Sequence, residues 1–211
     1  LTEAANTVGA QLVGALPGTG GMDAGQMLAG GLKAAILFNT EPVHDSAAGK
    51  NSVDGLASCE MVVTLSPFKA NLDLSDVLLP IAPFTETPGT FVNAEGRVQS
   101  FHAVVRPLGE TRPAWKVWRA MAEVLELPGF GFDSSQEVLA HIHASNPGGV
   151  PEIAPSARLS NSGAVSGVRV QTTVANPCVA AIYQLDGLVR RSTSLQLTAD
   201  GRATQVQEVT A

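Results

Sequence analysis

The sequence predicts an α/β fold, with a three-layer, mostly parallel sheet followed by an irregular, β-containing tail. Three short apolar runs stand in order: "LKAAILF" at 32–38, "MVVTL" at 61–65 and "DVLLPIA" at 76–82. Near-continuous apolar strands are typical of a parallel sheet covered on both faces. A helix-compatible stretch at 50–58 lies between the first two runs, which gives the alternation of open α/β sheets.

The composition changes at about residue 147 and predicts where this domain ends. Residues 147–167 are rich in Pro, Gly and Ser and read as linker or irregular cover. We therefore expect an α/β domain over residues 1–146 and a C-terminal tail or small subdomain over 147–211.

The first half of the chain contains the predicted sheet. Apolar spacing predicts a helix at 2–15, and Asp23 is a good cap for a short helix at 23–31. Strands are expected at 32–39, 60–66 and 76–82, with a helix at 50–58 and a loop after residue 39.

Further elements are predicted downstream. The segment 89–93 can pair with 97–107 across the turn at 94–96. A helix is expected at 113–127 with Pro113 at its first position, and another at 134–145 with a Ser134–Glu137 capping box. In the tail, residues 168–174 alternate as an edge strand does.

Composition narrows the function classes. Only 15% of the 211 residues are charged, against about 25% in a typical soluble domain. The net charge is -6 without a basic block, so no nucleic-acid interface is expected. The low charge predicts a large surface that is buried in an assembly, and self-association of a fragment through apolar patches.

The cysteines, apolar runs and N-terminus exclude further classes. Cys59 and Cys178 are too few for a disulfide framework or for an iron–sulfur cluster bound by this chain alone. No run approaches the ~18–20 apolar residues of a membrane span. The start "LTEAANTVGA" has neither Met nor a signal-peptide pattern, so we expect a piece of a longer protein.

The common catalytic and metal-binding patterns are missing, so we predict no catalytic residue and no metal site. There is no G-x-S-x-G elbow and no P-loop. His141 and His143 are two positions apart on a predicted helix and point about 200° apart. Cys59 stands at a helix–strand junction, which is not a ligand loop.

The polar loop "ETPGTFVNAEGRVQSF" at 86–101 has two interpretations. As a nucleotide clamp, amides near Gly89 would meet a phosphate and Arg97 would pair with it. As a self-supporting loop, Asn93 and Thr90 would cap a turn and Gly96 would supply a positive φ. Self-support is the favoured interpretation; in it, the Arg97 partner would be Glu86 or Glu95.

Two other positions are candidate sites. Asn39 and Glu41 follow a predicted strand, where open α/β sheets bind ligands, although a turn extended by Pro42 explains them too. Arg190 and Arg191 are candidate partner contacts, with Asp186 capping a short helix before them. A solvated basic pair is the equal alternative.

Two segments resemble a known family. "DVLLPIAPFTETPGTFVNAEGRVQSF" at 76–101 resembles a signature of the molybdopterin oxidoreductase superfamily. "IYQLDGLVRRSTSLQLTADG" at 182–201 is similar to the C-terminal end of the large iron–sulfur subunit of proton-pumping NADH-quinone oxidoreductase, respiratory complex I.

The second resemblance implies a non-catalytic scaffold in an NADH:quinone oxidoreductase. Iron–sulfur clusters would lie in a missing N-terminal region, and this chain would hold no cofactor. Its partners would be other peripheral-arm subunits at the cytoplasmic face of a bacterial inner membrane. Vestigial cofactor positions would be Asn39, Glu41, Glu86, Gly89, Thr90, Asn93 and Arg97.

Two alternatives stay open. In the first, the chain is the cofactor-binding part of an active, formate dehydrogenase-like oxidoreductase, and molybdopterin binds to its loops. In the second, it is a free-standing small-molecule binding module.

Overall fold

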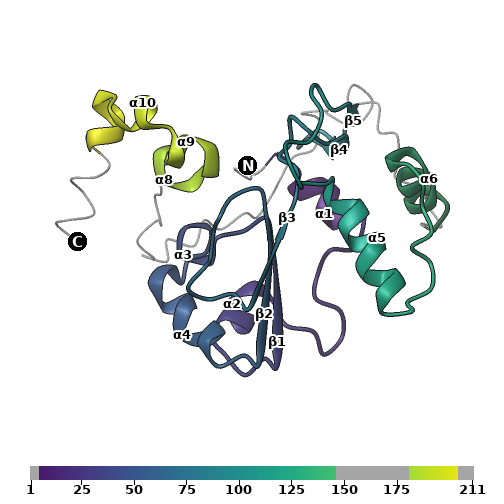
Figure 1. Cartoon of the computed structure of the whole chain (residues 1–211), viewed down its shortest axis with the longest axis horizontal. Helices are drawn as coiled ribbons and strands as arrows, with labels where there is room; N and C mark the ends of the chain where they lie inside the picture. Colours follow the sequence, from purple (N-terminus) through teal and green to yellow (C-terminus); the bar gives the residue numbers. More distant parts are fainter. Residues whose placement is uncertain (1–4, 146–180, 204–211) are drawn as a thin grey trace, which may run out of the picture.

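A parallel three-stranded sheet forms the centre of the computed structural model, which describes residues 5–145 and 181–203 (Figure 1). The strand order β1–β2–β3 follows the chain, so each connection is a crossover. This confirms the α/β class predicted from the three apolar runs. The strands are β1 (Ala34–Phe38), β2 (Met61–Ser66) and β3 (Val77–Pro80).

Helices cover one face of the sheet and build the core there. Leu37 of β1 and Val62 of β2 pack against Leu56, and Leu28 and Cys59 close the cluster. Asp23 caps the first of these helices in a reciprocal capping box with Gln26, as the sequence predicted. The helices are α2 (Ala24–Leu28), α3 (Pro42–Asp45), the 3₁₀ turn η1 (Gly49–Asn51) and α4 (Ser52–Ala57).

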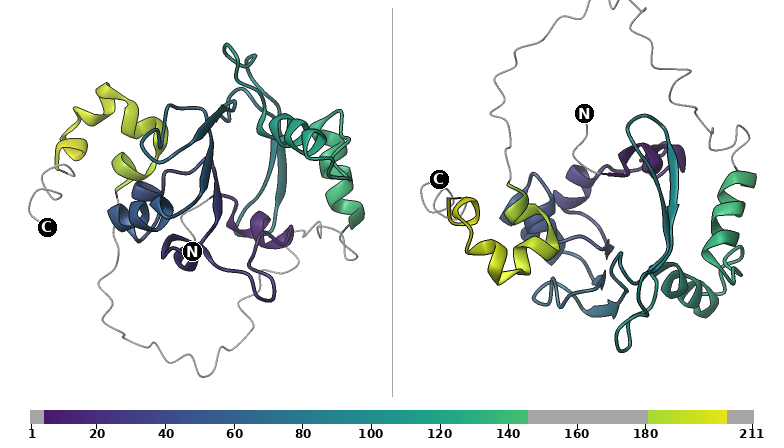
Figure 2. Two further views of the ribbon diagram at one scale, coloured as in Figure 1. Left: turned by 60° about the horizontal axis from the view of Figure 1, so that its bottom comes forward. Right: turned by 90° about the horizontal axis from the view of Figure 1, so that it is seen from above.

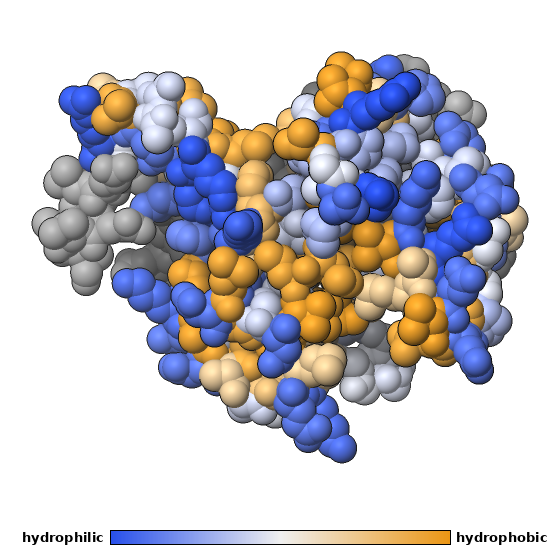
Figure 3. Space-filling view, in the orientation of Figure 1, coloured by the Kyte–Doolittle hydropathy of each residue, from blue (hydrophilic) through white to orange (hydrophobic). Residues whose placement is uncertain are grey.

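The opposite face of the sheet is apolar and open over much of its area. Ile36, Phe38 and Met61 are about half exposed, at 49%, 49% and 50%. Helix α5 (Ala114–Val124) reaches this face through an edge-to-face contact of Phe38 with Trp118, with ring centroids 5.9 Å apart. Figure 3 shows hydrophobic residues gathered around the strands. Both faces of a parallel sheet are normally covered, and burial of this face in an assembly stays a prediction.

A β-hairpin extends from the sheet domain, as predicted. Strands β4 (Gly89–Val92) and β5 (Val98–Phe101) pair antiparallel, with Val92 opposite Val98. Helix α1 (Thr7–Leu12) packs against β4 (Figure 2). The Val92 amide donates to Asn6 Oδ1 at 2.8 Å. The N-terminal segment thus supports the hairpin rather than the sheet.

Two longer helices follow the hairpin, with small differences from the prediction. Pro113 is the N-cap of α5 and not its first helical residue, because its ψ of 133° is not helical. In α6 (Ser135–Ser145), Ser134 Oγ accepts from the Glu137 amide at 3.1 Å as expected. The Glu137 carboxylate reaches one residue further than a capping box does, to the amide of Asp133 at 2.8 Å.

The described part of the tail is helical. Asp186 caps the second of the three tail helices, α9 (Gly187–Arg191), by accepting from the amides of Leu188 and Val189, as predicted. The strand predicted at 168–174 lies outside the described residues. In residues 5–145 and 181–203, no helix combines the length and apolarity needed to cross a bilayer. The tail helices are α8 (Ile182–Leu185), α9 (Gly187–Arg191) and α10 (Thr193–Gln196).

Candidate functional site

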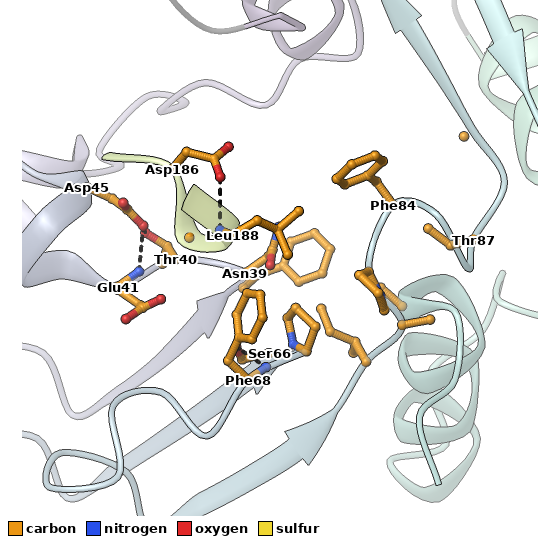
Figure 4. Close-up of a pocket in the computed structure, with 18 of the residues that line it drawn as sticks. Asn39, Thr40, Glu41, Asp45, Ser66, Phe68, Phe84, Thr87, Asp186 and Leu188 are labelled. Atoms are coloured by element: carbon orange, nitrogen blue, oxygen red, sulfur yellow. Dashed lines mark hydrogen bonds between the residues drawn. The ribbon is translucent and has the colours of Figure 1, made fainter. Parts of the chain in front are cut away.

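A cavity of about 510 Å³ lies at the carboxyl ends of all three parallel strands. This is where open α/β sheets bind their ligands. The loop after each strand contributes to the lining, and Figure 4 shows Phe84 and Thr87 facing Asn39 and Phe68 across the cavity. The lining after the strands consists of Asn39, Thr40 and Glu41; Ser66, Pro67 and Phe68; and Ile81, Ala82, Pro83 and Phe84.

The walls of this cavity are aromatic. The chain has 7 Phe, 2 Trp and 1 Tyr, and six of these ten residues line the cavity. Phe91 and Phe101 hold each other edge to face with centroids 5.2 Å apart, whereas Phe84 is 60% exposed. Such walls suit a planar ring system. The six are Phe38, Phe68, Phe84, Phe91, Phe101 and Trp115.

The segment after β1 is held in shape by local hydrogen bonds. Asn39 has a left-handed φ of 48°, which turns the chain away from the strand. Asp45 Oδ2 accepts from the Glu41 amide at 2.6 Å and from Thr40 Oγ1 at 3.2 Å. Asn71 Nδ2 donates to the Thr40 carbonyl at 2.9 Å. The one-turn helix α3, which the sequence analysis took for a loop, supplies this Asp45 anchor.

The Glu41 carboxylate binds two guanidinium groups of the tail. Arg190 Nη2 donates to Oε1 at 2.7 Å. Arg191 Nη2 donates to Oε2 at 2.9 Å, and its Nη1 forms an ion pair with Oε1 at 2.8 Å. Burial by itself would raise the pKa of Glu41. The hydrogen bonds from Arg191 and Arg190, together with their charges, outweigh burial, so the pKa lies below its ordinary value of 4.5.

The tail therefore forms one wall of the cavity. Leu185, Asp186 and Leu188 line it from α8 and α9, and the Arg191 guanidinium lies 4.2 Å from the centre of the Phe68 ring. Arg190 and Arg191, the candidate partner contacts, are thus engaged with a carboxylate of their own chain. Sequence reasoning treated the tail and the strand ends separately and did not foresee this meeting.

The polar loop supports itself at its turn. Asn93 Oδ1 accepts from the amides of Glu95 and Arg97, at 3.0 Å and 2.9 Å, and Gly96 has a φ of 83°. This confirms the Asn93 and Gly96 roles of the favoured interpretation. It also leaves the Asn93 side chain engaged in the turn.

Other details of the self-supporting interpretation are wrong. Thr90 Oγ1 bonds Ser100 Oγ across the hairpin at 3.0 Å instead of capping the turn. Glu86 accepts from the Leu108 amide at 2.9 Å. Within the described ranges, Arg97 forms no ion pair with Glu86 or Glu95. Strand β4 lies between Glu86 and the turn that contains Arg97.

Only part of the candidate set reaches the cavity. Asn39, Glu41 and Gly89 line it, whereas the other candidates do not. Sequence reasoning missed the aromatic walls and Thr87. The available signal was an aromatic residue at or shortly after the end of each strand: Phe38 ends β1, Phe68 follows β2 and Phe84 follows β3. The candidates outside this cavity are Glu86, Thr90, Asn93 and Arg97.

One wall residue carries a buried donor that needs a partner. Trp115 Nε1 is buried and has no acceptor within the described protein. An unpaired buried donor costs about 1–3 kcal/mol, so an acceptor atom in the cavity would stabilise it. Trp115 also borders a second cavity of about 310 Å³ beside Phe101 and α6.

The described residues do not build a metal site of their own. In the ranges 5–145 and 181–203, no three His, Cys, Asp or Glu side chains gather as ligands would. Cys59 precedes β2 and packs against the core at the amino end of the sheet, opposite the cavity. It therefore does not face a group bound at the strand ends.

Comparison with known proteins identifies the family. Residues 1–124, more than half of the chain, match the model of the molybdopterin oxidoreductases. The chain belongs to the molybdopterin oxidoreductase family. The matched range includes all three strands, the hairpin and most of the cavity lining, so the cavity lies in the part that is characteristic of the family.

Curated relatives are much longer proteins. A "Putative formate dehydrogenase" of Staphylococcus aureus (strain bovine RF122 / ET3-1) is 44% identical over 59 residues, which are 28% of this chain and 6% of that protein. A "Nitrate reductase" of Shewanella frigidimarina (strain NCIMB 400) is 28% identical over 117 residues, 54% of this chain and 12% of that protein. The chain thus spans a small part of the length of these relatives.

Proposed function

We propose that this chain forms one wall of the cofactor cleft in an active molybdopterin oxidoreductase of the formate dehydrogenase or nitrate reductase type. The observation that carries the proposal is the aromatic cavity at the carboxyl ends of all three strands. The names of the relatives support this function better than a scaffold role in complex I.

The residues of the cavity fit a planar pterin or purine ring. Phe68, Phe84 and Trp115 offer ring faces, and the unpaired Trp115 N–H offers a donor. Glu41, Asp45 and Asp186 also line the cavity, but each already accepts hydrogen bonds from this chain. The polar contact with a ring therefore rests on the unpaired Trp115 donor.

When bound, the molybdopterin group supplies a metal centre for two-electron oxidation or reduction. The role of this chain is to bind and orient that group. Asn39 and Thr40 lie on a segment that Asp45 and Asn71 hold in shape, so their polar atoms are pre-organised.

The test is cofactor content in the intact protein that carries this chain. We expect the purified protein to contain molybdenum or tungsten and a pterin in stoichiometric amounts, measured by plasma mass spectrometry and pterin fluorescence. Trp115→Phe keeps the ring but removes the donor, and should lower cofactor retention about 5- to 100-fold. Trp118→Phe is the matched control, since Trp118 packs on Phe38 outside the cavity lining. A well-folded protein without metal or pterin would refute the proposal.

A second candidate is a scaffold like the C-terminal region of the large iron–sulfur subunit of complex I. It is favoured by the resemblance of residues 182–201 and by the position of that tail, which lines the cavity and pairs with Glu41. This function predicts co-purification with flavin- and iron-containing subunits of a quinone reductase, without molybdenum, at the cytoplasmic face of the membrane. Native electrophoresis of solubilised membranes followed by mass spectrometry separates the two candidates.

A further inference from the structure

We propose that α8 and α9 form a latched lid on the strand-end cavity, and that the contact of Glu41 with Arg190 and Arg191 is the latch. The inference rests on the proposed function, because the cavity that the lid covers is the proposed ligand site. It adds a mechanism by which ligand entry and release are controlled.

The tail helices are too short to be ordered without docking. Isolated helices of fewer than about 12 residues are marginal in water. Helix α8 has 4 residues and α9 has 5. Their order must therefore come from what they touch, and α8 contacts α3, the turn that follows Glu41.

The docking contact is concentrated in one cluster of charges. Glu41, Arg190 and Arg191 have side-chain exposures of 17%, 15% and 33%, so water screens the pairs only partly. Arg191 binds both oxygens of Glu41 and also covers the Phe68 ring. Apolar residues of both helices stay open, as Leu188 of α9 is 45% exposed and Ile182 of α8 is 63% exposed. Breaking the charge cluster should therefore release the lid.

The same contact joins the lid to the ligand position. Glu41 and Arg190 line the cavity, and Phe68 supports Arg191 and forms a wall. With α9 docked, Asp186 and Leu188 close this side of the cavity, as Figure 4 shows. With α9 released, this side opens while the Asp45 anchor keeps the strand-end segment in place. A ring would then enter and leave faster, while the ring faces of Phe84 and Trp115 stay in place.

Hydrogen exchange on the 211-residue chain tests the latch directly. Glu41→Gln keeps the shape of the side chain but removes its charge. We expect backbone amides 187–191 to exchange at least about 10-fold faster in this variant, while amides of β2 remain protected. The matched control is Glu60→Gln, which changes an exposed carboxylate at the amino end of the sheet. Unchanged exchange at 187–191 in Glu41→Gln, with β2 intact, would overturn the latch.

A second measurement separates failure of the lid from failure of the proposed function. Guanosine monophosphate serves as the probe, and Trp fluorescence in a stopped-flow instrument follows its binding. A lid predicts that Glu41→Gln raises both the association and dissociation rates about 10-fold and changes the Kd less. Binding with equal rates in both proteins would overturn the lid and leave the ligand site standing. Absence of binding in both would count against the ligand site, and hydrogen exchange alone would then decide the latch.

Discussion

The turn at residues 93–97 and the segment at residues 39–41 are both polar and both adjoin a strand, but they find partners at different distances along the chain. In the turn, Asn93 accepts from amides two and four residues later. In the strand-end segment, the Glu41 carboxylate accepts hydrogen bonds from guanidinium groups that lie 149 and 150 residues later in the chain.

The difference separates a turn with a purely structural role from a contact that can be broken and remade. A turn that satisfies its own polar groups forms whenever the hairpin forms and does not respond to the rest of the molecule. A carboxylate that is paired with a remote helix can lose that partner without loss of the strand beneath it. The motif that stands out in the sequence is therefore self-contained, and the less conspicuous "NTE" after β1 carries the carboxylate whose remote partner can be released.

The largest expected effect comes from reversing the charge of Glu41. Glu41→Lys places a third cation against Arg190 and Arg191, and an unpaired, partly buried charge costs about 3–5 kcal/mol. We expect amides 187–191 to exchange at least about 100-fold faster, because the tail undocks. The unfolding midpoint of the sheet in urea should change little. Glu95→Lys, in the exposed part of the turn, is the control. If the whole sheet unfolds with the tail, the two regions are not independent.

Gly89→Ala is expected to have the next largest effect and to act on the hairpin side. An added Cβ would lie 2.5 Å from Cζ of Phe101, so the ring must move. Overpacking of this kind costs about 1–3 kcal/mol, which a lower urea midpoint would report. Gly131→Ala is the matched control, since a Cβ there meets nothing within 4 Å. Equal midpoints for the two variants would show that Phe101 has room to yield.

Asn93→Ala tests the self-supporting turn with a smaller expected effect. The change removes the acceptor for two amides that lie near water, so we expect a loss of about 1 kcal/mol. Exchange should accelerate in β4 and β5 and stay unchanged at 187–191. Glu95→Gln, which alters an exposed neighbouring side chain and leaves the Asn93 acceptor in place, should have no effect. Faster exchange in α9 would contradict the separation of the two regions.

The helices and strands that could be predicted are those that are specified by residues within the same segment of sequence. Three apolar runs predicted β1, β2 and β3, and Asp23, Ser134 and Asp186 cap helices where their side chains predict it. Helix α3 was missed because a helix of 4 residues is too short to show a helical period in the sequence. Its Asp45 accepts from the Glu41 amide, which only the folded geometry reveals.

Only the position of the site, at the carboxyl ends of the parallel strands, could be predicted from the topology. Asn39 and Glu41 reach the cavity because ligands bind beyond the ends of parallel strands. The strand-end rule extends to Phe68 and Phe84, but Trp115 comes from α5, and no local pattern assigns that helix to the cavity. The Glu41 partners were beyond reach for the same reason: a charge pair across 149 residues depends on where the tail lies, and no local pattern records it.

The smallest expected effect is a pH dependence confined to the tail. Because the pKa of Glu41 is lowered in the docked state, the ion pairs stabilise docking fully above its ordinary value of 4.5. That stabilisation is lost as the pH falls through the lowered pKa and the carboxylate is protonated. Protection of amides 187–191 should therefore stay constant from about pH 7 to about pH 5 and decrease below about pH 4.5, after correction for intrinsic exchange. Glu41→Gln has no such carboxylate and should show no step over this range. A step of equal size in the variant would show that the pH dependence does not come from Glu41.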